Sequence, residues 1–563
     1  MNMTVTESGL RKYPGWVKEG AIVTLLVLIA FVLRQAVYVI LFTDSISYLS
    51  FAKNILSGVH HGSEVSIARY RYPPLYSHLI ALFSFGKPDP FILIETGRQI
   101  SIIAGSLTVI PLYLLTRRMF SIWAAVFSVL ILILTPEFLY YSGAVLTESL
   151  SVLIITVCLF LLWIISERKV PLFFYFVLGA SFGLAFLARH AAIGFLAVSL
   201  AWIFFRKIVK NGQDKTAGSY LTWVVPVILI MIGFMALNLP QVIYLHSETD
   251  RWSLTGNFLT DPSKNWLHAG KDLRFTPAGE ALKSLTPDGK QYIFEVDSPS
   301  SLSSTLIVMI KQPVGYVKAY IKTLAGGYVH DTRSLPYPGI ILILAIAGTV
   351  SLLQKKRIKE LGFLLWIFGG YYLFLALFHN IRDRYMFPAY PLLLVIAGFG
   401  AAALVSLILD SANRRKIPFM TEPLVGCVMI TAIFVFLFPA ATGLVKDVNS
   451  AYNLGYYRAM NKELSGKIEP GAYVFDRNPH RAFFGGGQFT GVPYASIDKT
   501  ISFGQIRGVR YWIVSPDYVP RFRPQFSLLL SNPENYRDYL KPLGIYGNEK
   551  ERTILFEIVP DTG

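Results

Sequence analysis

The chain has 563 residues, of which 53% are hydrophobic and only 15% are charged. Soluble globular domains carry about 25% charged residues, so this composition and a mean hydropathy of +0.48 exclude an ordinary cytosolic enzyme. The 40 Phe, 31 Tyr and 9 Trp exclude a disordered chain. The net charge of +17 comes mainly from basic residues in short turns between apolar segments, so we expect no nucleic acid partner. The composition predicts a polytopic α-helical membrane protein.

Eleven apolar segments come close to the roughly 20 residues that cross the hydrocarbon core of a bilayer. The first follows Arg11, Lys12 and Lys18 and lacks a small-residue cleavage site, so we interpret it as a retained anchor rather than a signal peptide. The predicted spans are 21–42, 99–116, 119–135, 145–165, 171–188, 191–206, 221–240, 338–354, 361–378, 386–409 and 421–442.

The turns between these spans predict the orientation. With the N-terminus in the cytoplasm, all five internal turns are basic, as the positive-inside rule requires. The turns contain Arg117-Arg118, Arg168-Lys169, Arg206-Lys207, Lys355-Lys356-Arg357 and Arg414-Arg415-Lys416.

This orientation gives three regions. We predict a cytoplasmic tail (1–20), a transmembrane catalytic domain (21–445) with large outer loops at 43–98 and 241–337, and an extracytoplasmic C-terminal domain (446–563). Channels and secondary transporters usually keep both faces short. Here the large polar loops and the C-terminal domain are all predicted on the outer face. This asymmetry favours a membrane-embedded enzyme whose active site is open to that face.

Two carboxylates lie at the outer ends of predicted spans. Asp44 follows the first span, and Glu148 stands at the mouth of the fourth. Partial desolvation at this depth is expected to raise the basicity of a carboxylate and suit it to accept a proton from an acceptor hydroxyl. The structural alternatives are that Asp44 caps a helix over 46–57 and that Glu148 complements a helix dipole.

Cationic and aromatic side chains collect on the same face. Arg71 precedes Pro73-Pro74, Arg189 ends the fifth span, and Arg384 with Tyr385 follows the ninth. Because arginine binds phosphate oxygens in a bidentate fork, these residues from separated segments are predicted to bind one lipid-linked phosphate. Contact with lipid headgroups is the alternative for each arginine.

The C-terminal segment is predicted to form a small α/β domain. The expected helices are 451–466 and 524–541, and the expected strands are 472–476, 510–515 and 552–559. Gly485-Gly486-Gly487 between them is interpreted as a plain turn, because no Lys-Ser/Thr pair follows it.

No cofactor or metal is predicted. His60, His61, His78 and His268 lack metal-ligand spacing, and Asp44 has no acidic partner beside it. A divalent metal stays possible, without support from the sequence.

Five short motifs, taken in order, resemble bacterial GT-C glycosyltransferases. Asp44 opens D-S-x-x-Y-L-x-x-A-x-x-x-L-x-G, Arg71 opens R-x-P-P-L, and Glu148 lies in L-T-E-S-L. Arg189 lies in A-R-H, and Arg384 opens R-Y-x-x-P-x-x-P. Within GT-C the chain most resembles the dolichyl-phosphate-mannose-protein mannosyltransferase-like superfamily, which includes the aminoarabinose transferases of lipid A. The resemblance covers about residues 20–400.

The resemblance implies a glycosyltransferase of the cell (inner) membrane. The enzyme would move a hexose or pentose, with inversion, from a polyprenyl-phosphate donor to a lipid, glycan or protein acceptor on the outer face. The resemblance assigns Asp44 as catalytic base, Arg71 and Arg384 to the donor phosphate, and Glu148 to the acidic position of the fourth span. Ser45 replaces the second acidic residue of the protein mannosyltransferases, which leaves the acceptor and any metal use open. The absence of a W-W-D-Y-G motif argues against transfer of a preassembled glycan to asparagine.

Three other functions fit parts of the pattern. A transporter or flippase of lipid-linked sugars would use the arginines without needing Asp44 as a base. An O-antigen ligase or polymerase-like enzyme would rely on arginines and a histidine of the large loop. A catalytically inactive binding subunit would act through its C-terminal domain.

Overall fold

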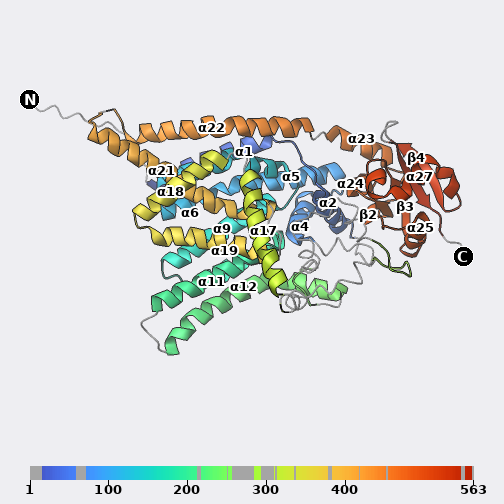
Figure 1. Ribbon diagram of the computed structural model, residues 1–563, viewed down its shortest axis with the longest axis horizontal. Helices are drawn as coiled ribbons and strands as arrows, with labels where there is room; N and C mark the ends of the chain where they lie inside the picture. Colours follow the sequence, from blue (N-terminus) through green and yellow to red (C-terminus); the bar gives the residue numbers. More distant parts are fainter. Residues whose placement is uncertain are drawn as a thin grey trace, which may run out of the picture.

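The computed structural model describes residues 15–58, 72–211, 217–249, 252–255, 284–292, 310, 313–334, 338–377, 383–417, 419–451, 454–546 and 552–560. These residues form a bundle of apolar helices with a small sheet domain at one end (Figure 1). The chain is therefore a helical membrane protein with a C-terminal α/β domain, as its composition predicts.

Helices make up the first half of the described chain. They are α1 (Gly15–Gln35), α2 (Thr43–Leu56), α4 (Pro74–Phe83), α5 (Pro90–Leu107), α6 (Val109–Met119), α7 (Ile122–Leu134), α8 (Pro136–Gly143), α9 (Glu148–Glu167), α10 (Phe173–Ala188), α11 (Ala192–Asn211) and α12 (Ala217–Thr249).

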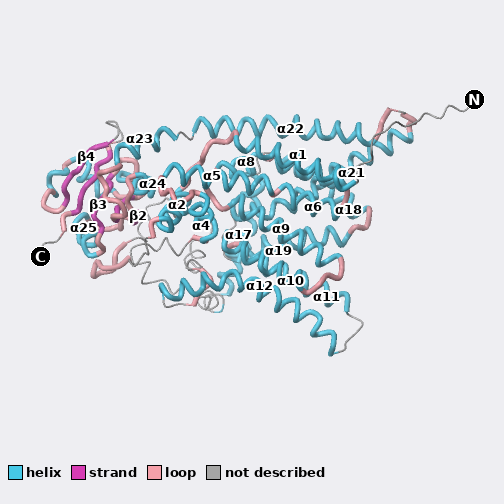
Figure 2. Tube along the Cα trace, turned by 180° about the vertical axis from the view of Figure 1, so that it is seen from behind, coloured by secondary structure: helices cyan, strands magenta, loops and turns pink. Residues whose placement is uncertain are grey.

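The bundle is completed by helices from the second half. They are α17 (Pro313–Ser334), α18 (Pro338–Gln354), α19 (Ile358–Leu377), α20 (Asp383–Met386), the 3-10 turn η2 (Phe387–Ala389), α21 (Tyr390–Arg414) and α22 (Glu422–Ala451). The helix α22 runs along one edge of the bundle toward the sheet domain in both views (Figure 1 and Figure 2).

All eleven predicted spans overlap helices. Among the described residues, six helices are long and apolar enough to cross a membrane, or seven if the bent pair α7 and α8 forms one span. Four shorter apolar helices, at Pro74–Phe83, Phe173–Ala188, Ala192–Arg206 and Gly339–Gln354, fall below that length. The number of eleven spans therefore stays a prediction.

Two predicted span boundaries are wrong. The helix α1 ends at Gln35 rather than at 42, because side chains elsewhere bind the backbone of the following residues. The helix α5 begins at Pro90 rather than at 99. The carboxylate of Asp89 accepts hydrogen bonds from the amides of Phe91 and Ile92, at 2.9 and 3.0 Å, and so starts the helix early.

Close packing at two glycines fixes the position of α21, the helix of the tenth predicted span. A Cβ atom on Gly400 of α21 would lie 1.9 Å from the carbonyl oxygen of Leu344 in α18. A Cβ atom on Gly348 of α18 would lie 2.2 Å from the carbonyl oxygen of Ile396 in α21. Only glycine allows two backbones to approach this closely, so α18 holds α21 in position.

The C-terminal domain is built on one mixed sheet. Its helical segments are α23 (Leu454–Leu464), α24 (Pro479–Phe484), α25 (Ile497–Ile506), α26 (Val519–Phe522), η3 (Pro524–Phe526), α27 (Ser527–Ser531) and η4 (Pro533–Tyr536). Its strands are β1 (Tyr473–Asp476), β2 (Gln488–Gly491), β3 (Val509–Val514), β4 (Leu540–Tyr546) and β5 (Thr553–Ile558).

The strand order is β2-β1-β3-β5-β4, with β1 parallel to β2 and β3 and with β5 antiparallel to β3 and β4. The three predicted strands are confirmed, and β2 and β4 were not predicted. The predicted helix over 524–541 is wrong. Pro524 and Pro533 lack the amide hydrogens that a continuous helix needs, so this segment forms η3, the five-residue α27 and η4, and then β4.

The two parts of the molecule share a core. The large buried apolar cluster of the bundle includes Phe483 and Phe484 of α24. The rings of Phe91 in α5 and Phe484 lie 5.6 Å apart, centroid to centroid. The C-terminal domain therefore sits against the end of the bundle where α2 and α5 begin (Figure 1).

Candidate active site

Asp44 lies in the first turn of α2 and does not cap it. The N-cap residue is Phe42, whose amide donates to the Oγ of Ser45 at 2.9 Å. The side chain of Asp44 instead accepts a hydrogen bond from the Tyr72 hydroxyl at 2.9 Å and one from Arg384 Nη2 at 2.6 Å. The capping alternative is therefore wrong for Asp44, because its oxygens face other segments of the chain.

Glu148 is the first residue of α9 and is fully buried. One of its oxygens, Oε1, lies 2.7 Å from Nη1 of Arg189 and 3.2 Å from Nε of Arg384. A buried carboxylate needs such partners, because an unpaired charge away from water is costly. Glu148 thus holds two arginines that come from different helical segments.

Arg384 joins the two carboxylates into one cluster. The side chain of Glu148 is 0% exposed, whereas those of Asp44 and Arg384 are 26% and 32% exposed. The cluster therefore has a closed end at Glu148 and an accessible end at Asp44.

Tyr385 packs against both arginines of the cluster. Its ring centroid lies 4.9 Å from the guanidinium carbon of Arg189 and 5.9 Å from that of Arg384. Its backbone carbonyl accepts a hydrogen bond from the hydroxyl of Tyr371 in α19 at 2.9 Å. The ring face is therefore close to both guanidinium groups, which a cation–π interaction favours.

The charge of Asp44 is stabilised in this arrangement. Burial opposes ionisation, but the charge of Arg384 and the hydrogen bonds from Arg384 and Tyr72 outweigh it, so the pKa of Asp44 lies below its usual value of 3.8. The expectation that desolvation makes Asp44 more basic is therefore wrong for the protein without bound donor, because the expectation did not include the charge of Arg384.

A backbone β-bridge joins the two chain segments that precede Asp44 and Glu148. Ile40 pairs with Ala144 in an isolated parallel β-bridge. The amide of Ile40 donates to the carbonyl of Gly143 at 3.0 Å, and the amide of Val145 donates to the carbonyl of Ile40 at 3.2 Å. Asp44 and Glu148 each follow this bridge by a few residues, so their separation is fixed by the backbone.

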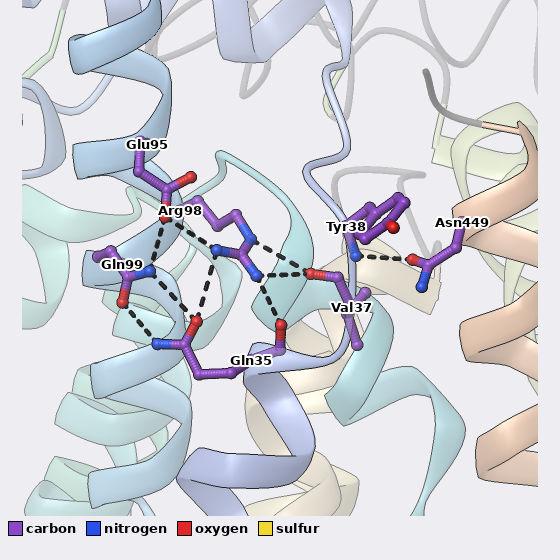
Figure 3. A network of polar contacts seen from close by, with 7 residues as sticks. All are labelled: Gln35, Val37, Tyr38, Glu95, Arg98, Gln99 and Asn449. Carbon is purple, nitrogen blue, oxygen red and sulfur yellow. Dashed lines mark hydrogen bonds and ion pairs between the residues drawn. The ribbon is translucent and has the colours of Figure 1, made fainter. Parts of the chain in front are cut away.

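Arg98 of α5 holds the chain between α1 and that bridge (Figure 3). Its Nη2 donates to the carbonyls of Gln35 and Val37 at 2.8 and 2.9 Å, and its Nη1 donates to Glu95 at 2.9 Å. Asn449 of α22 accepts from the amide of Tyr38 at 2.8 Å on the other side. These contacts satisfy backbone groups that the end of α1 leaves open.

The sequence pointed to most of these residues. Asp44, Glu148, Arg189, Arg384 and Tyr385 come together in one cluster. The predicted phosphate ligand Arg71 lies outside the described residues.

Tyr72 and Arg98 were missed. The signal for Tyr72 was its place inside the R-x-P-P-L motif, directly after Arg71. The signal for Arg98 was a lone arginine at the mouth of the second predicted span, where an unpaired charge is expensive.

Unpartnered donors suit the site to an anion. The Nε and Nη2 atoms of Arg189 are buried and have no hydrogen-bond partner among the described residues. A phosphate oxygen is the kind of acceptor that such donors bind. Among the described residues, no group of three or more His, Cys, Asp or Glu side chains could hold a metal ion.

A protein-family model matches part of the chain. Residues 72–236 match the family model described as dolichyl-phosphate-mannose-protein mannosyltransferase. A search of curated protein sequences gives no match.

Solved structures share the fold over most of the chain. The chain is similar to ArnT from Cupriavidus metallidurans bound to undecaprenyl phosphate, at 12% identity and a TM-score of 0.56, over 97% of this chain and 98% of that one. It is also similar to an oligosaccharyltransferase from Archaeoglobus fulgidus in complex with zinc and sulfate, at 14% identity and a TM-score of 0.55, over 94% and 72% of the chains. The archaeal oligosaccharyltransferase AglB, with an inhibitory peptide and a dolichol-phosphate, gives 13% identity and a TM-score of 0.54 over 96% and 74%.

The matched segment contains Tyr72, Glu148 and Arg189. The family match over residues 72–236 and this shared fold support a membrane glycosyltransferase of the GT-C superfamily.

Proposed function

We propose that the protein transfers one sugar, with inversion, from a polyprenyl-phosphate donor to an acceptor hydroxyl on the outer face of the cell membrane. One observation carries this proposal: Arg384 joins Asp44, at the accessible end of the cluster, to the buried Glu148–Arg189 pair. A base and a set of cations at one opening are what such a transfer needs.

The reaction is a single displacement. The acceptor oxygen attacks the anomeric carbon of the donor sugar, and the bond from that carbon to the phosphate oxygen breaks. The electron pair of that bond leaves with the phosphate, and the acceptor proton moves to the carboxylate of Asp44. Attack opposite to the leaving group inverts the anomeric centre.

Donor binding and base strength are coupled through Arg384 in this proposal. Without donor, Arg384 neutralises Asp44 and makes it a weak base. A donor phosphate would compete with Asp44 for the same guanidinium group. As Arg384 turns to the phosphate, Asp44 loses its counter-charge and becomes more basic at the moment the donor is present.

Glu148 and Arg189 provide the fixed part of the site. Within the cluster, two arginines balance two carboxylates, so an incoming phosphate would add a net negative charge. We propose that Arg71 supplies the further cation. We also propose that Tyr385 keeps Arg189 in place beside the donor phosphate.

The comparisons support a lipid-linked donor. The structural neighbours were solved with undecaprenyl phosphate and with a dolichol-phosphate. We propose a bacterial polyprenyl carrier, with the N-terminus in the cytoplasm and the C-terminal domain outside.

The test is turnover of polyprenyl-phosphate sugars by purified protein. We expect Asp44→Asn to bind donor and to lose transfer by at least a hundredfold, because the amide cannot accept the proton. Asp498→Asn is the matched control, since Asp498 is an exposed aspartate in the first turn of α25. Full turnover by Asp44→Asn would overturn the transferase mechanism. Movement of donor across liposome membranes by that variant would favour the flippase alternative.

A further inference from the structure

A cavity of about 210 Å³ lies between α2 and the C-terminal domain. The two parts that enclose it are adjacent in both views (Figure 1 and Figure 2). It is smaller than the roughly 300–1,000 Å³ of pockets for drug-sized ligands, so it suits one small ring. The cluster around Glu148 does not line this cavity.

One face of α2 leads from Asp44 into the cavity. Ser47, Phe51 and Asn54 line the cavity and follow Asp44 at steps of three or four residues. Residues at this spacing lie on the same side of a helix. Tyr72 also lines the cavity, and its hydroxyl donates to Asp44. Among the described residues, Tyr72 therefore contacts both the cavity and the base.

The opposite wall comes from the C-terminal domain. Phe483 of α24, the turn at Gly486-Gly487 and the first residues of β2 contribute to it. Gly486 has φ +90°, a left-handed conformation that glycine adopts without strain. The predicted plain turn at the three glycines is confirmed, and it also forms part of a wall.

A weak contact crosses the cavity. Nε2 of Gln488 donates to Oδ1 of Asn54 at 3.4 Å, which is long for a hydrogen bond. Both amides have further donor and acceptor capacity. A ligand hydroxyl between them would improve on this contact.

The lining has the chemistry that recognises a sugar ring. Serine hydroxyls and the amides of Asn54 and Gln488 can both donate and accept hydrogen bonds, while phenyl rings cover apolar faces. Among the described lining residues, Lys53 is the one charged group, and its ammonium lies 6.0 Å from the centroid of Phe483. The lining thus suits a neutral polyhydroxyl group better than a phosphate or a peptide.

We propose that this cavity binds the acceptor, as a single neutral sugar ring whose hydroxyl reaches Asp44 past Tyr72. The proposal rests on the proposed function for the identity of the ligand as acceptor. It gives the C-terminal domain a defined role: it supplies half of the acceptor subsite. Acceptor selection then depends on residues more than 400 positions away from Asp44, such as Gln488.

The test fills the cavity and measures binding apart from turnover. Ser50 lines the cavity, and Ser50→Phe would occupy it. Ser531→Phe is the matched control, because Ser531 is exposed on α27 and lies outside the cavity. A panel of neutral methyl glycosides is titrated into each protein by calorimetry, and the same glycosides serve as acceptors with polyprenyl-phosphate sugars. Gln488→Leu provides a milder change from the other wall.

We expect at least one glycoside to bind the wild type and Ser531→Phe, and Ser50→Phe to weaken it by tenfold or more. Gln488→Leu should raise the acceptor KM several-fold. Binding of no glycoside, or equal binding by Ser50→Phe, would overturn the inference. Glycoside binding without turnover of any donor would instead overturn the proposed function.

Discussion

The guanidinium Nη2 of Arg384 lies 2.6 Å from Oδ2 of Asp44, although 340 residues separate them in the chain. The same guanidinium reaches Glu148 through its Nε at 3.2 Å. One arginine therefore contacts both carboxylates that the sequence marks at the outer face. Its position controls the charge of the accessible end of the cluster.

Replacing Arg384 should remove both the counter-charge of Asp44 and the cation proposed to stabilise the leaving phosphate. We expect Arg384→Gln to lower kcat on the order of 10²–10³-fold, because a cation that stabilises the departing phosphate is lost. Arg384→Lys keeps the charge without the fork and should recover part of the rate. Steady-state transfer kinetics with saturating donor measure this. An unchanged kcat in Arg384→Gln would contradict the assignment.

The pH dependence of Asp44 should move when Arg384 is removed. The pKa of Asp44 is lowered in the folded protein, so the ion pair stabilises the fold above the ordinary aspartate pKa of 3.8 and loses that effect as the pH falls through the lowered value. The acid limb of kcat/KM should accordingly lie below pH 4 in the wild type and rise in Arg384→Gln. Profiles from pH 3.5 to 8 in detergent would show it, and a limb that does not move would exclude Asp44 as the titrating base.

Glu148 should matter for folding more than an exposed glutamate does. Glu148→Gln leaves Arg189 buried without its counter-charge, and loss of one partner of a buried pair costs about 3–5 kcal/mol. The control is Glu167→Gln at the other end of α9, where the partner Arg118 is 39% exposed, so its loss should cost at most about 1 kcal/mol. Thermal unfolding followed by light scattering or a thiol dye distinguishes the two. Equal Tm values would show that the buried pair contributes nothing.

Arg98 is expected to act as a positioning residue. Arg98→Met removes the hydrogen bonds to the carbonyls of Gln35 and Val37, which lie on the path to Asp44. We expect kcat to fall at least tenfold, with the KM for donor little changed, because a small displacement of a catalytic group is enough to slow the reaction. Arg98→Lys should recover part of kcat. A fall in Tm alone, with normal kcat in the folded fraction, would indicate a purely structural role.

The C-terminal domain should carry its own pH dependence. Burial raises the pKa of Asp476 to about 7, although Arg481 and two backbone amides oppose the rise. The folded state then binds a proton that the unfolded state has lost, so stability falls as the pH rises from about 4 to 7 and levels off above that range. The size of this fall is on the order of a few kcal/mol.

Asp476→Asn should remove that slope and raise the Tm at pH 8. Asp498→Asn is the control, since Asp498 is an exposed aspartate of the same domain, in the first turn of α25. Calorimetric scans of the full-length protein at pH 5 to 8 are the measurement. A Tm of the wild type that stays constant over this range would contradict the raised pKa.

The sequence by itself determined the membrane-embedded helical class, the small C-terminal α/β domain and most residues of the cluster. Hydropathy is a property of local segments, so each of the eleven predicted spans overlaps a helix. The three strands with strong apolar character were predicted for the same reason, whereas β2 and β4 contain glycine or proline and gave a weaker signal.

Tertiary structure alone decided how these residues meet. Arg384 and Asp44 are 340 residues apart in the chain, and the packing of the helices brings α20 beside α2. No local sequence pattern encodes that contact. That contact reversed the expected basicity of Asp44, since a charge at hydrogen-bond distance outweighs partial burial. The cavity beside Asp44 arises in the same way, because half of its wall comes from residues beyond position 469.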